Sequence, residues 1–274
     1  MISATMMRIQ FYMTTSNDEE IQFIRQCVHD SFVLYDDKYP QLGGKEYLRD
    51  HFLVDLPIYR NMIIADQLAR TLPQKACVLD FGFGYGDMAY LIRNRRQDIK
   101  ITGLEILTSE PWQILTSRIK LKTVIDVDES RIPLASASFD AIVANGALEH
   151  VRDERTSLRE LRRILRPGGI LYIFLYPNMY SYTEFIQKHI GHPSHEVKKT
   201  LAGLSSLLES EGFTVVEKRR QFFLPFTLSR FSPPIRKLYN FLAKPICALN
   251  SIAEQIPLLN LFCATLTIHA EHHD

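Results

Sequence analysis

The stretch Val78–Asp87, VLDFGFGYGD, holds three glycines within five positions, after an apolar run and before a segment with helical character. Glycine has no Cβ atom, so Gly82 and Gly84 permit unusual backbone angles and let a ligand approach the main chain. In open α/β sheets, ligands bind outside the carboxyl ends of the strands, where such a turn lies. The stretch therefore predicts an α/β fold with a ligand site at this turn.

The rest of the chain extends this pattern on both sides. Short apolar runs alternate with helical stretches from residue 76 onward, which predicts a parallel sheet covered on both faces. Residues 18–72 show helical spacing, so we expect an N-terminal helical extension over 1–72 and an α/β domain over 73–274. The predicted strands lie near 76–81, 99–105, 122–127, 139–145, 169–176, 213–221 and 264–270, and the predicted helices near 87–96, 109–119, 153–165 and 197–211.

Composition narrows the class of protein. The chain has 274 residues, of which 46% are hydrophobic, and this is ordinary for a globular protein with a large core. The net charge of +1 gives no indication of nucleic-acid binding. The scattered cysteines form no C-x-x-C pair, and we expect no disulfide framework and no metal site. No secretory signal or membrane-spanning stretch is recognised, so a cytoplasmic location is expected.

Several ligands compete for the glycine turn. A P-loop requires G-x-x-x-x-G-K-[ST], and no lysine follows here. A nicotinamide or flavin site prefers G-x-G-x-x-G, whereas this spacing is G-x-G-x-G, with Asp87 where the last glycine would fall. Asp80 favours a nucleoside without phosphate, because a carboxylate repels pyrophosphate and suits a cationic ligand. If the glycines are considered alone, a tight turn that binds no ligand is the alternative interpretation.

The second predicted strand adds an acidic residue at its end. Glu105 lies 23 residues after Gly82, and an acidic residue at about this distance accepts hydrogen bonds from ribose hydroxyls. One carboxylate can accept from two vicinal hydroxyls. A solvated glutamate at the strand terminus is the alternative interpretation.

Further motifs follow in order along the chain: SFDAIV at 138–143, NGALEHV at 145–151 and LRRILRPGG at 161–169. Together with the glycine turn they resemble the class I S-adenosylmethionine-dependent methyltransferases, especially the broad small-molecule branch, similar to methyltransferase type 11. The resemblance covers roughly residues 76–216. It implies a seven-stranded, mostly parallel Rossmann-like sheet with a final antiparallel strand, and S-adenosylmethionine as the methyl donor.

The resemblance also implies a set of cofactor-binding residues. Asp80 and the loop glycines match the loop around the amino-acid end of the donor, and Glu105 matches the ribose-binding acid. The remaining matching positions are Ile106 on the adenine, Asp128 and Glu129 near the adenine amino group, and Asn145 and Gly146 near the sulfonium. The three loop glycines in this set are Gly82, Gly84 and Gly86.

The methyl acceptor is less well defined. His150 and His195 are the candidate catalytic residues, because histidine is readily poised near neutral pH, although each can serve a structural or solvated role instead. Tyr180 and Tyr182, after the fifth strand, are candidate substrate contacts. The fourth strand ends in Asn145-Gly146-Ala147-Leu148 without the [DN]-P-P-[FY] of amino-methyltransferases, which disfavours nucleic-acid and glutamine-amide substrates.

Residues 222–262 lie outside the family pattern. We expect a helical insertion or cap there, with helices near 233–243 and 246–256. Residues 217–250 carry seven basic residues against Glu217, a balance of +6, interleaved with apolar side chains. Such a mixture suits an amphiphilic acceptor or a peripheral membrane contact, while a cap packed on the sheet is the alternative. Two functions stay open: methyl transfer to a small-molecule or lipid-like acceptor, with S-adenosylhomocysteine as product, and an inactive donor-binding partner or sensor.

Overall fold

The central sheet is the main element of the fold. The structure is a computed structural model that describes residues 16–106, 108–125, 131–189, 195–226 and 231–273. Its strands are β1 (Cys77–Phe81), β2 (Lys100–Glu105), β3 (Lys122–Ile125), β4 (Phe139–Asn145), β5 (Leu165–Pro177), β6 (Phe213–Gln221) and β7 (Thr265–His272). They form one seven-stranded sheet with the order β3-β2-β1-β4-β5-β7-β6. β1 to β5 pair in parallel and β7 runs antiparallel to both neighbours, which confirms the predicted topology.

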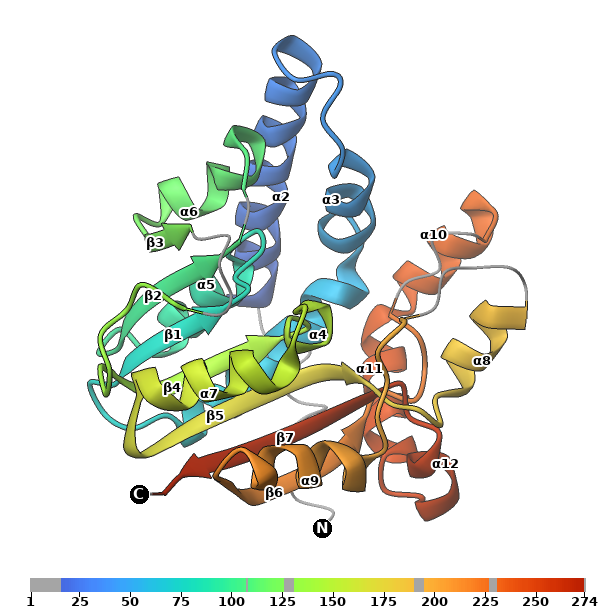
Figure 1. Ribbon diagram of the computed structural model, residues 1–274. Coiled ribbons are helices and arrows are strands. Elements are labelled where there is room, and N and C mark those ends of the chain that lie inside the picture. Colours follow the sequence, from blue (N-terminus) through green and yellow to red (C-terminus); the bar gives the residue numbers. More distant parts are fainter. Residues whose placement is uncertain (1–15, 107, 126–130, 190–194, 227–230, 274) are drawn as a thin grey trace.

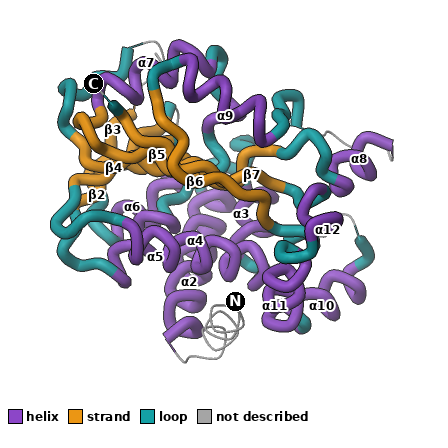
Figure 2. The backbone as a smooth tube through the Cα atoms, turned by 90° about the horizontal axis from the view of Figure 1, so that it is seen from below, coloured by secondary structure: helices purple, strands orange, loops and turns teal. Residues whose placement is uncertain are grey.

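Helices cover both faces of this sheet (Figure 2). Successive side chains of a strand point to opposite faces. Val78 accordingly belongs to the hydrophobic core on one face, and Leu79 to the core on the other. Because both faces are buried, the central strands are apolar on both sides. The first face is covered by α4 (Asp55–Thr71) and α5 (Asp87–Arg95), and the second by α7 (Glu154–Ile164) and α9 (Leu201–Ser210).

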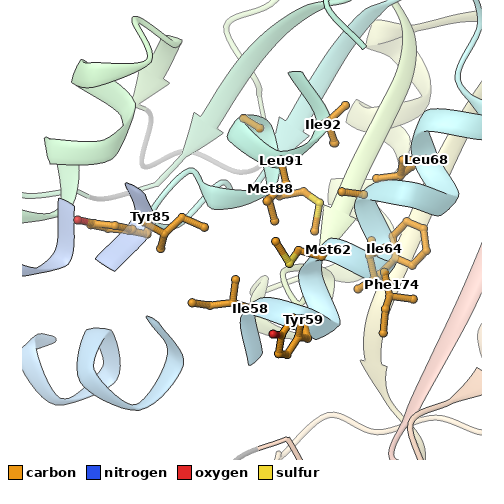
Figure 3. Packing of buried hydrophobic residues seen from close by; sticks show 14 of the residues in the cluster. Ile58, Tyr59, Met62, Ile64, Leu68, Tyr85, Met88, Leu91, Ile92 and Phe174 are labelled. Atoms are coloured by element: carbon orange, nitrogen blue, oxygen red, sulfur yellow. The ribbon is translucent and has the colours of Figure 1, made fainter. Parts of the chain in front are cut away.

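The N-terminal helices share the first of these cores. Met62 of α4 and Met88 of α5 lie between the helices, near Phe174 of β5 (Figure 3). The helices α2 (Ser16–Asp37) and α3 (Lys45–Phe52) contribute further buried side chains to the same cluster. The expected boundary at residue 72 therefore marks a change of secondary structure within a continuous core.

Some predicted elements differ from the structure at their ends, and the largest shifts are at α9 and β5. α9 begins at Leu201, although a helix from residue 197 was expected, because Lys199 forms a β-bridge with Asn178 and Thr200 caps the helix. The Thr200 Oγ1 atom accepts a hydrogen bond from the Gly203 amide at 2.9 Å. β5 begins at Leu165, four residues before the predicted start, and pairs there with β4 across a register shift.

The C-terminal helices gather at one end of the molecule. The insertion between β6 and β7 contains the two expected helices, α10 (Pro233–Phe241) and α11 (Ala243–Ala253), and an additional short one, α12 (Pro257–Leu261). Both overall views place them beside α8 (Tyr182–His189), which was not predicted (Figures 1 and 2). The carboxyl ends of β4 and β5 point toward this end (Figure 1). Among the described helices, none combines the length and apolar character needed to cross a bilayer.

Candidate active site

The glycine turn forms the floor of a cavity of about 540 Å³ at the carboxyl ends of the strands. Gly82 and Gly84 have φ angles of +70° and +53°, a region that favours glycine. A Cβ atom on Gly82 would lie 2.5 Å from the Ala147 Cβ, so this glycine is required by packing. A Cβ atom on Gly84 would meet nothing within 4 Å. Gly84 therefore leaves its backbone open to the cavity.

Asp80 lies at the end of β1, on the wall of the same cavity. Its side chain is almost fully buried, and its Oδ2 atom has no hydrogen-bond partner. Burial, together with the nearby carboxylates of Asp87 and Glu105, raises the pKa of Asp80 to about 8. Asp87 is also buried and accepts a hydrogen bond from Asn61 Nδ2 at 2.7 Å. An acidic environment of this kind suits a cation and disfavours a pyrophosphate.

Glu105 ties the end of β2 to the glycine turn. Its Oε2 atom accepts a hydrogen bond from the Gly84 amide at 3.0 Å, and its Oε1 atom accepts one from the Ile106 amide at 3.0 Å. Each carboxylate oxygen has a second lone pair, so both can also accept from a ligand hydroxyl. Ile106 is half exposed at the cavity rim, where it offers an apolar contact surface.

Asn145 and Gly146 follow at the end of β4. Both line the cavity, and the Asn145 Oδ1 atom is buried without a partner. The Gly146 φ angle of +65° turns the chain into the short 3-10 helix η2 (Leu148–His150). This turn brings Glu149 and His150 to the cavity wall beside the strand ends.

His195 reaches the same wall from the segment after α8. Its backbone amide donates to Glu184 Oε2 at 3.0 Å, and its Nδ1 atom lies 2.8 Å from Glu184 Oε1. This hydrogen bond raises the pKa of His195 above its usual value. The ring centroids of His150 and His195 are 6.0 Å apart. Glu149 lies beside them, and burial raises its pKa to about 7.

The structure thus brings most of the predicted site residues into one cavity. Tyr180 and Tyr182 are not among the residues that line it: Tyr180 is half exposed, and the Tyr182 ring packs 4.9 Å from the Phe223 ring. Asp128 and Glu129 lie outside the described residues. Asp80, Gly82, Gly84, Glu105, Ile106, Asn145, Gly146, His150 and His195 line the cavity, while Gly86 packs against Thr116 beside it.

Sequence reasoning missed one side of the cavity. The N-terminal helices and the segment before α6 (Ile114–Arg118) supply this side, and several of its members are aromatic. The aromatic residues of 47–52 were a usable signal, but only the fold shows that α3 faces the glycine turn. The residues concerned are Tyr47, His51, Phe52, Arg60, Asn61 and Trp112.

Comparison with known proteins identifies the family. Residues 79–173 match a family model described as a methyltransferase domain. An O-methyltransferase of Aspergillus nomiae is 30% identical over 168 residues, covering 56% of this chain and 70% of the relative. The chain belongs to the class I S-adenosylmethionine-dependent methyltransferases. This is a family of enzymes that take the methyl group from S-adenosylmethionine.

The family model matches the central part of this methyltransferase, and the relatives also match only part of it. A demethylmenaquinone methyltransferase of Thermotoga maritima is 34% identical over 122 residues, 44% of this chain and 52% of the relative. The chain spans about half the length of such relatives or less. A solved S-adenosylmethionine-dependent methyltransferase from Thermotoga maritima superposes with a TM-score of 0.52 at 18% identity, covering 78% of this chain and 91% of its own. At this identity the superposition supports the fold alone.

The cavity fits the methyl donor of the family. The unpartnered Asp80 oxygen can accept from an ammonium group, and the open backbone at Gly84 leaves room for the amino-acid part of the donor. The lone pairs of Glu105 can accept from ribose hydroxyls.

Proposed function

We propose that this methyltransferase moves a methyl group from S-adenosylmethionine to a small-molecule or lipid-like acceptor. The observation that carries the proposal is the single cavity in which a buried acidic end at Asp80 adjoins a histidine-lined end at His150 and His195. The first end suits a cationic donor and the second suits the reacting group of an acceptor. Such convergence of polar groups in one concave site is typical of enzyme active sites.

The residues of the chain mainly bind and orient in this proposal. The donor supplies an activated methyl group on a positively charged sulfur. Asp80 holds the ammonium group, Glu105 holds the ribose hydroxyls, and Ile106 packs on the adenine, with Asp128 and Glu129 as proposed contacts of its amino group. Orientation of two reactants can lower a barrier by roughly 7–11 kcal/mol, so positioning accounts for much of the rate enhancement.

The acceptor end provides polar contacts to the reacting group. Glu184 holds Nδ1 of His195, so its Nε2 atom is available to the cavity. His150 is largely exposed beside it and is free to adjust to an acceptor. Asn145 and Gly146 border the space between the two ends. A proton must be removed only if the acceptor attacks through a group that is protonated at neutral pH.

Exposed apolar side chains of α8 and of the insertion between β6 and β7 support a lipid-like acceptor. Phe241 is 82% exposed and Leu258 is 68% exposed, and α10 and α12 bury none of their residues. Large exposed apolar patches mark sites of protein, lipid or membrane contact. We name the following residues the cap surface: Phe185, Ile186, Phe231, Ile235, Leu238, Phe241, Leu249, Ile252, Ile256, Leu258 and Phe262.

Basic residues lie within the same region. Lys188 and Lys237 are exposed near the cap surface, and Lys244 is half-buried. Part of the positive charge of residues 217–250 is engaged within the chain, because Arg219 donates a hydrogen bond to Gln67 Oε1 at 2.7 Å. Apolar side chains beside lysines are typical of helices that lie in a membrane interface. We therefore propose that the cap surface contacts the cytoplasmic face of an anionic membrane, which presents the acceptor to the cavity.

Methyl transfer from a labelled donor tests this proposal. The protein is incubated with methyl-tritiated S-adenosylmethionine and, separately, with a membrane lipid extract or a water-soluble metabolite extract. We expect S-adenosylhomocysteine release and label in the organic phase with the lipid extract. Label confined to the aqueous extract would overturn the lipid-like acceptor. Donor binding without S-adenosylhomocysteine release in either extract would favour the inactive binding protein.

Vesicle binding tests the cap surface separately. Burial of one large apolar side chain contributes about 1.5–3 kcal/mol, so the double variant Phe241→Ser, Leu258→Ser should sediment markedly less with anionic vesicles. Val33→Ser is the matched control, because Val33 is 57% exposed on α2, outside the cap surface. Equal sedimentation of all three proteins would contradict membrane contact through the cap surface.

A further inference from the structure

Three potential metal ligands meet at the acceptor end of the cavity. Glu149, His150 and His195 each offer one ligand atom, and these atoms all lie within 4.8 Å of one another. Two come from the turn η2 after β4, and the third comes from the segment after α8. We propose that this Glu-His-His cluster binds a divalent transition-metal ion, such as Zn²⁺, within the cavity.

The carboxylate of Glu149 lacks the partners that a buried charge requires. Its side chain is only 4% exposed, and its Oε2 atom has no hydrogen-bond partner. Its Oε1 atom lies 3.8 Å from His150 Nε2, too far for a hydrogen bond. Buried carboxylates are normally paired or coordinated to a metal, because an isolated buried charge is unfavourable. A cation at the cluster would supply the missing partner.

His195 is held in the orientation that a metal ligand needs. Glu184 binds its Nδ1 atom and its backbone amide, and Lys198 Nζ lies 3.4 Å from the same carboxylate. Glu184 is itself buried, on the inner side of α8. A carboxylate that fixes one ring nitrogen of a histidine leaves the other for the ion, and this arrangement recurs around protein-bound metals. His195 Nε2 is therefore the third ligand atom.

The ligand set selects the class of ion. Imidazole nitrogens with one carboxylate suit Zn²⁺, Fe²⁺ and related ions, whereas Ca²⁺ and Mg²⁺ prefer oxygen ligands. Bond lengths of about 2.0–2.2 Å require ligand atoms closer together than 4.8 Å, so some closure must accompany binding. The His150 side chain is 65% exposed and can rotate to provide it.

The position of the cluster gives the ion a role beyond structure. Three protein ligands leave at least one coordination position open, as in catalytic zinc sites. The cavity that holds the cluster also holds Asp80 and the glycine turn, so an acceptor oxygen could bind the ion while facing the donor. A bound ion lowers the pKa of a coordinated hydroxyl group. In this arrangement His150 and His195 act as ligands rather than as bases.

Zinc binding by the purified protein tests the cluster directly. The chelator-treated protein is titrated with Zn²⁺ by calorimetry, and bound metal is counted by mass spectrometry after dialysis. We expect one ion per chain in the wild type, and loss of that ion in Glu149→Gln and in His195→Ala. Glu184→Gln should bind about 10–100-fold more weakly, because it removes only the partner that orients His195.

The control variant is His273→Ala. His273 lies 3.6 Å from a carboxylate oxygen of Glu271, outside the cavity, so its loss removes a histidine–carboxylate pair without touching the cluster. It should keep the full zinc content. Circular dichroism and donor affinity of the metal-free variants show whether each is folded, and they separate this test from that of donor binding.

Two outcomes would overturn the metal site. In the first, the wild type retains no more zinc after dialysis than the double variant Glu149→Gln, His195→Ala. In the second, Glu149→Gln and His195→Ala each keep the ion. Replacement of Zn²⁺ by Co²⁺ adds a spectroscopic check: the visible absorption of a nitrogen- and oxygen-bound ion should appear in the wild type and disappear in His195→Ala.

Discussion

The donor end of the cavity and the cap surface are built in opposite ways. At the donor end, Asp80 is 2% exposed, and Glu105 is hydrogen-bonded to the glycine turn. On the cap surface, Phe241 is 82% exposed and packs against little of the chain. Exposed apolar side chains contribute no hydrophobic stabilisation to the folded monomer. The first region is therefore a buried polar site with an acceptor, Asp80 Oδ2, left for a ligand, whereas the second is an exposed apolar surface for which we propose a membrane partner.

Gly84→Val should have the largest effect on the donor end. The φ angle of +53° is unfavourable for a β-branched residue, and the new side chain would project into the space proposed for the donor. Strain of about 1–3 kcal/mol and the lost space together predict at least a hundredfold loss of donor affinity by calorimetry. Vesicle sedimentation should be unchanged. Normal donor affinity would show that the glycine turn is not the donor site.

Glu105→Ala should have the second-largest effect on donor affinity. The substitution removes the two charge-assisted interactions proposed with the ribose hydroxyls, as well as the hydrogen bonds to the Gly84 and Ile106 amides. Such interactions contribute about 1.5–3 kcal/mol, which corresponds to a ten- to hundredfold loss of donor affinity. Because Glu105 also ties down the turn, amide hydrogen exchange of residues 82–86 should become faster. An unchanged dissociation constant would remove Glu105 from the proposed ribose contacts.

Substitution of Asp80 should have a smaller effect on donor affinity, and donor binding through Asp80 should depend on pH. Its pKa of about 8 leaves the Asp80 carboxyl group mostly protonated in the free protein at pH 7. A bound cation lowers that pKa. Donor binding at pH 7 should therefore release a proton, and affinity should rise with pH below the pKa. Calorimetry in buffers of different ionisation enthalpy measures this release. Asp80→Asn should abolish it and weaken binding by about tenfold. Proton uptake in the wild type would contradict the assignment.

Leu238→Ser should have the smallest effect at the donor end. Leu238 is 61% exposed on the cap surface and does not line the cavity. We expect donor affinity within about twofold of the wild type and weaker binding to anionic vesicles, because each buried apolar side chain stabilises membrane contact. A large loss of donor affinity in a folded Leu238→Ser protein would mean that the two regions are not independent.

The difference between the two regions also determines what the sequence could predict. The central strands were predictable because each is an apolar run, and the position of Asp80 and Glu105 at the cavity was predictable because each lies at the end of such a strand. α8 and α12 were missed because short helices give few turns of periodic pattern. The start of α9 was wrong because Lys199 pairs with Asn178, a contact between distant segments.

The acceptor end depends still more on long-range packing. Glu149 and His195 come together only because η2 and the segment after α8 meet at the same wall. Glu184 carries no signal in the sequence, because its role follows from its hydrogen bonds to His195 and not from its neighbours in sequence. Likewise, α3 supplies Tyr47 to the cavity from a segment that carries no family motif. Local patterns cannot predict such contacts.

Calorimetric titration of the purified chain with S-adenosylmethionine and with NAD tests the central claim most directly. The glycine spacing, the buried carboxylate of Asp80 and the position of Glu105 predict that S-adenosylmethionine binds with one molecule per chain. NAD should not bind, because its pyrophosphate would face the acidic groups around the turn. Binding of NAD without binding of S-adenosylmethionine would contradict the account.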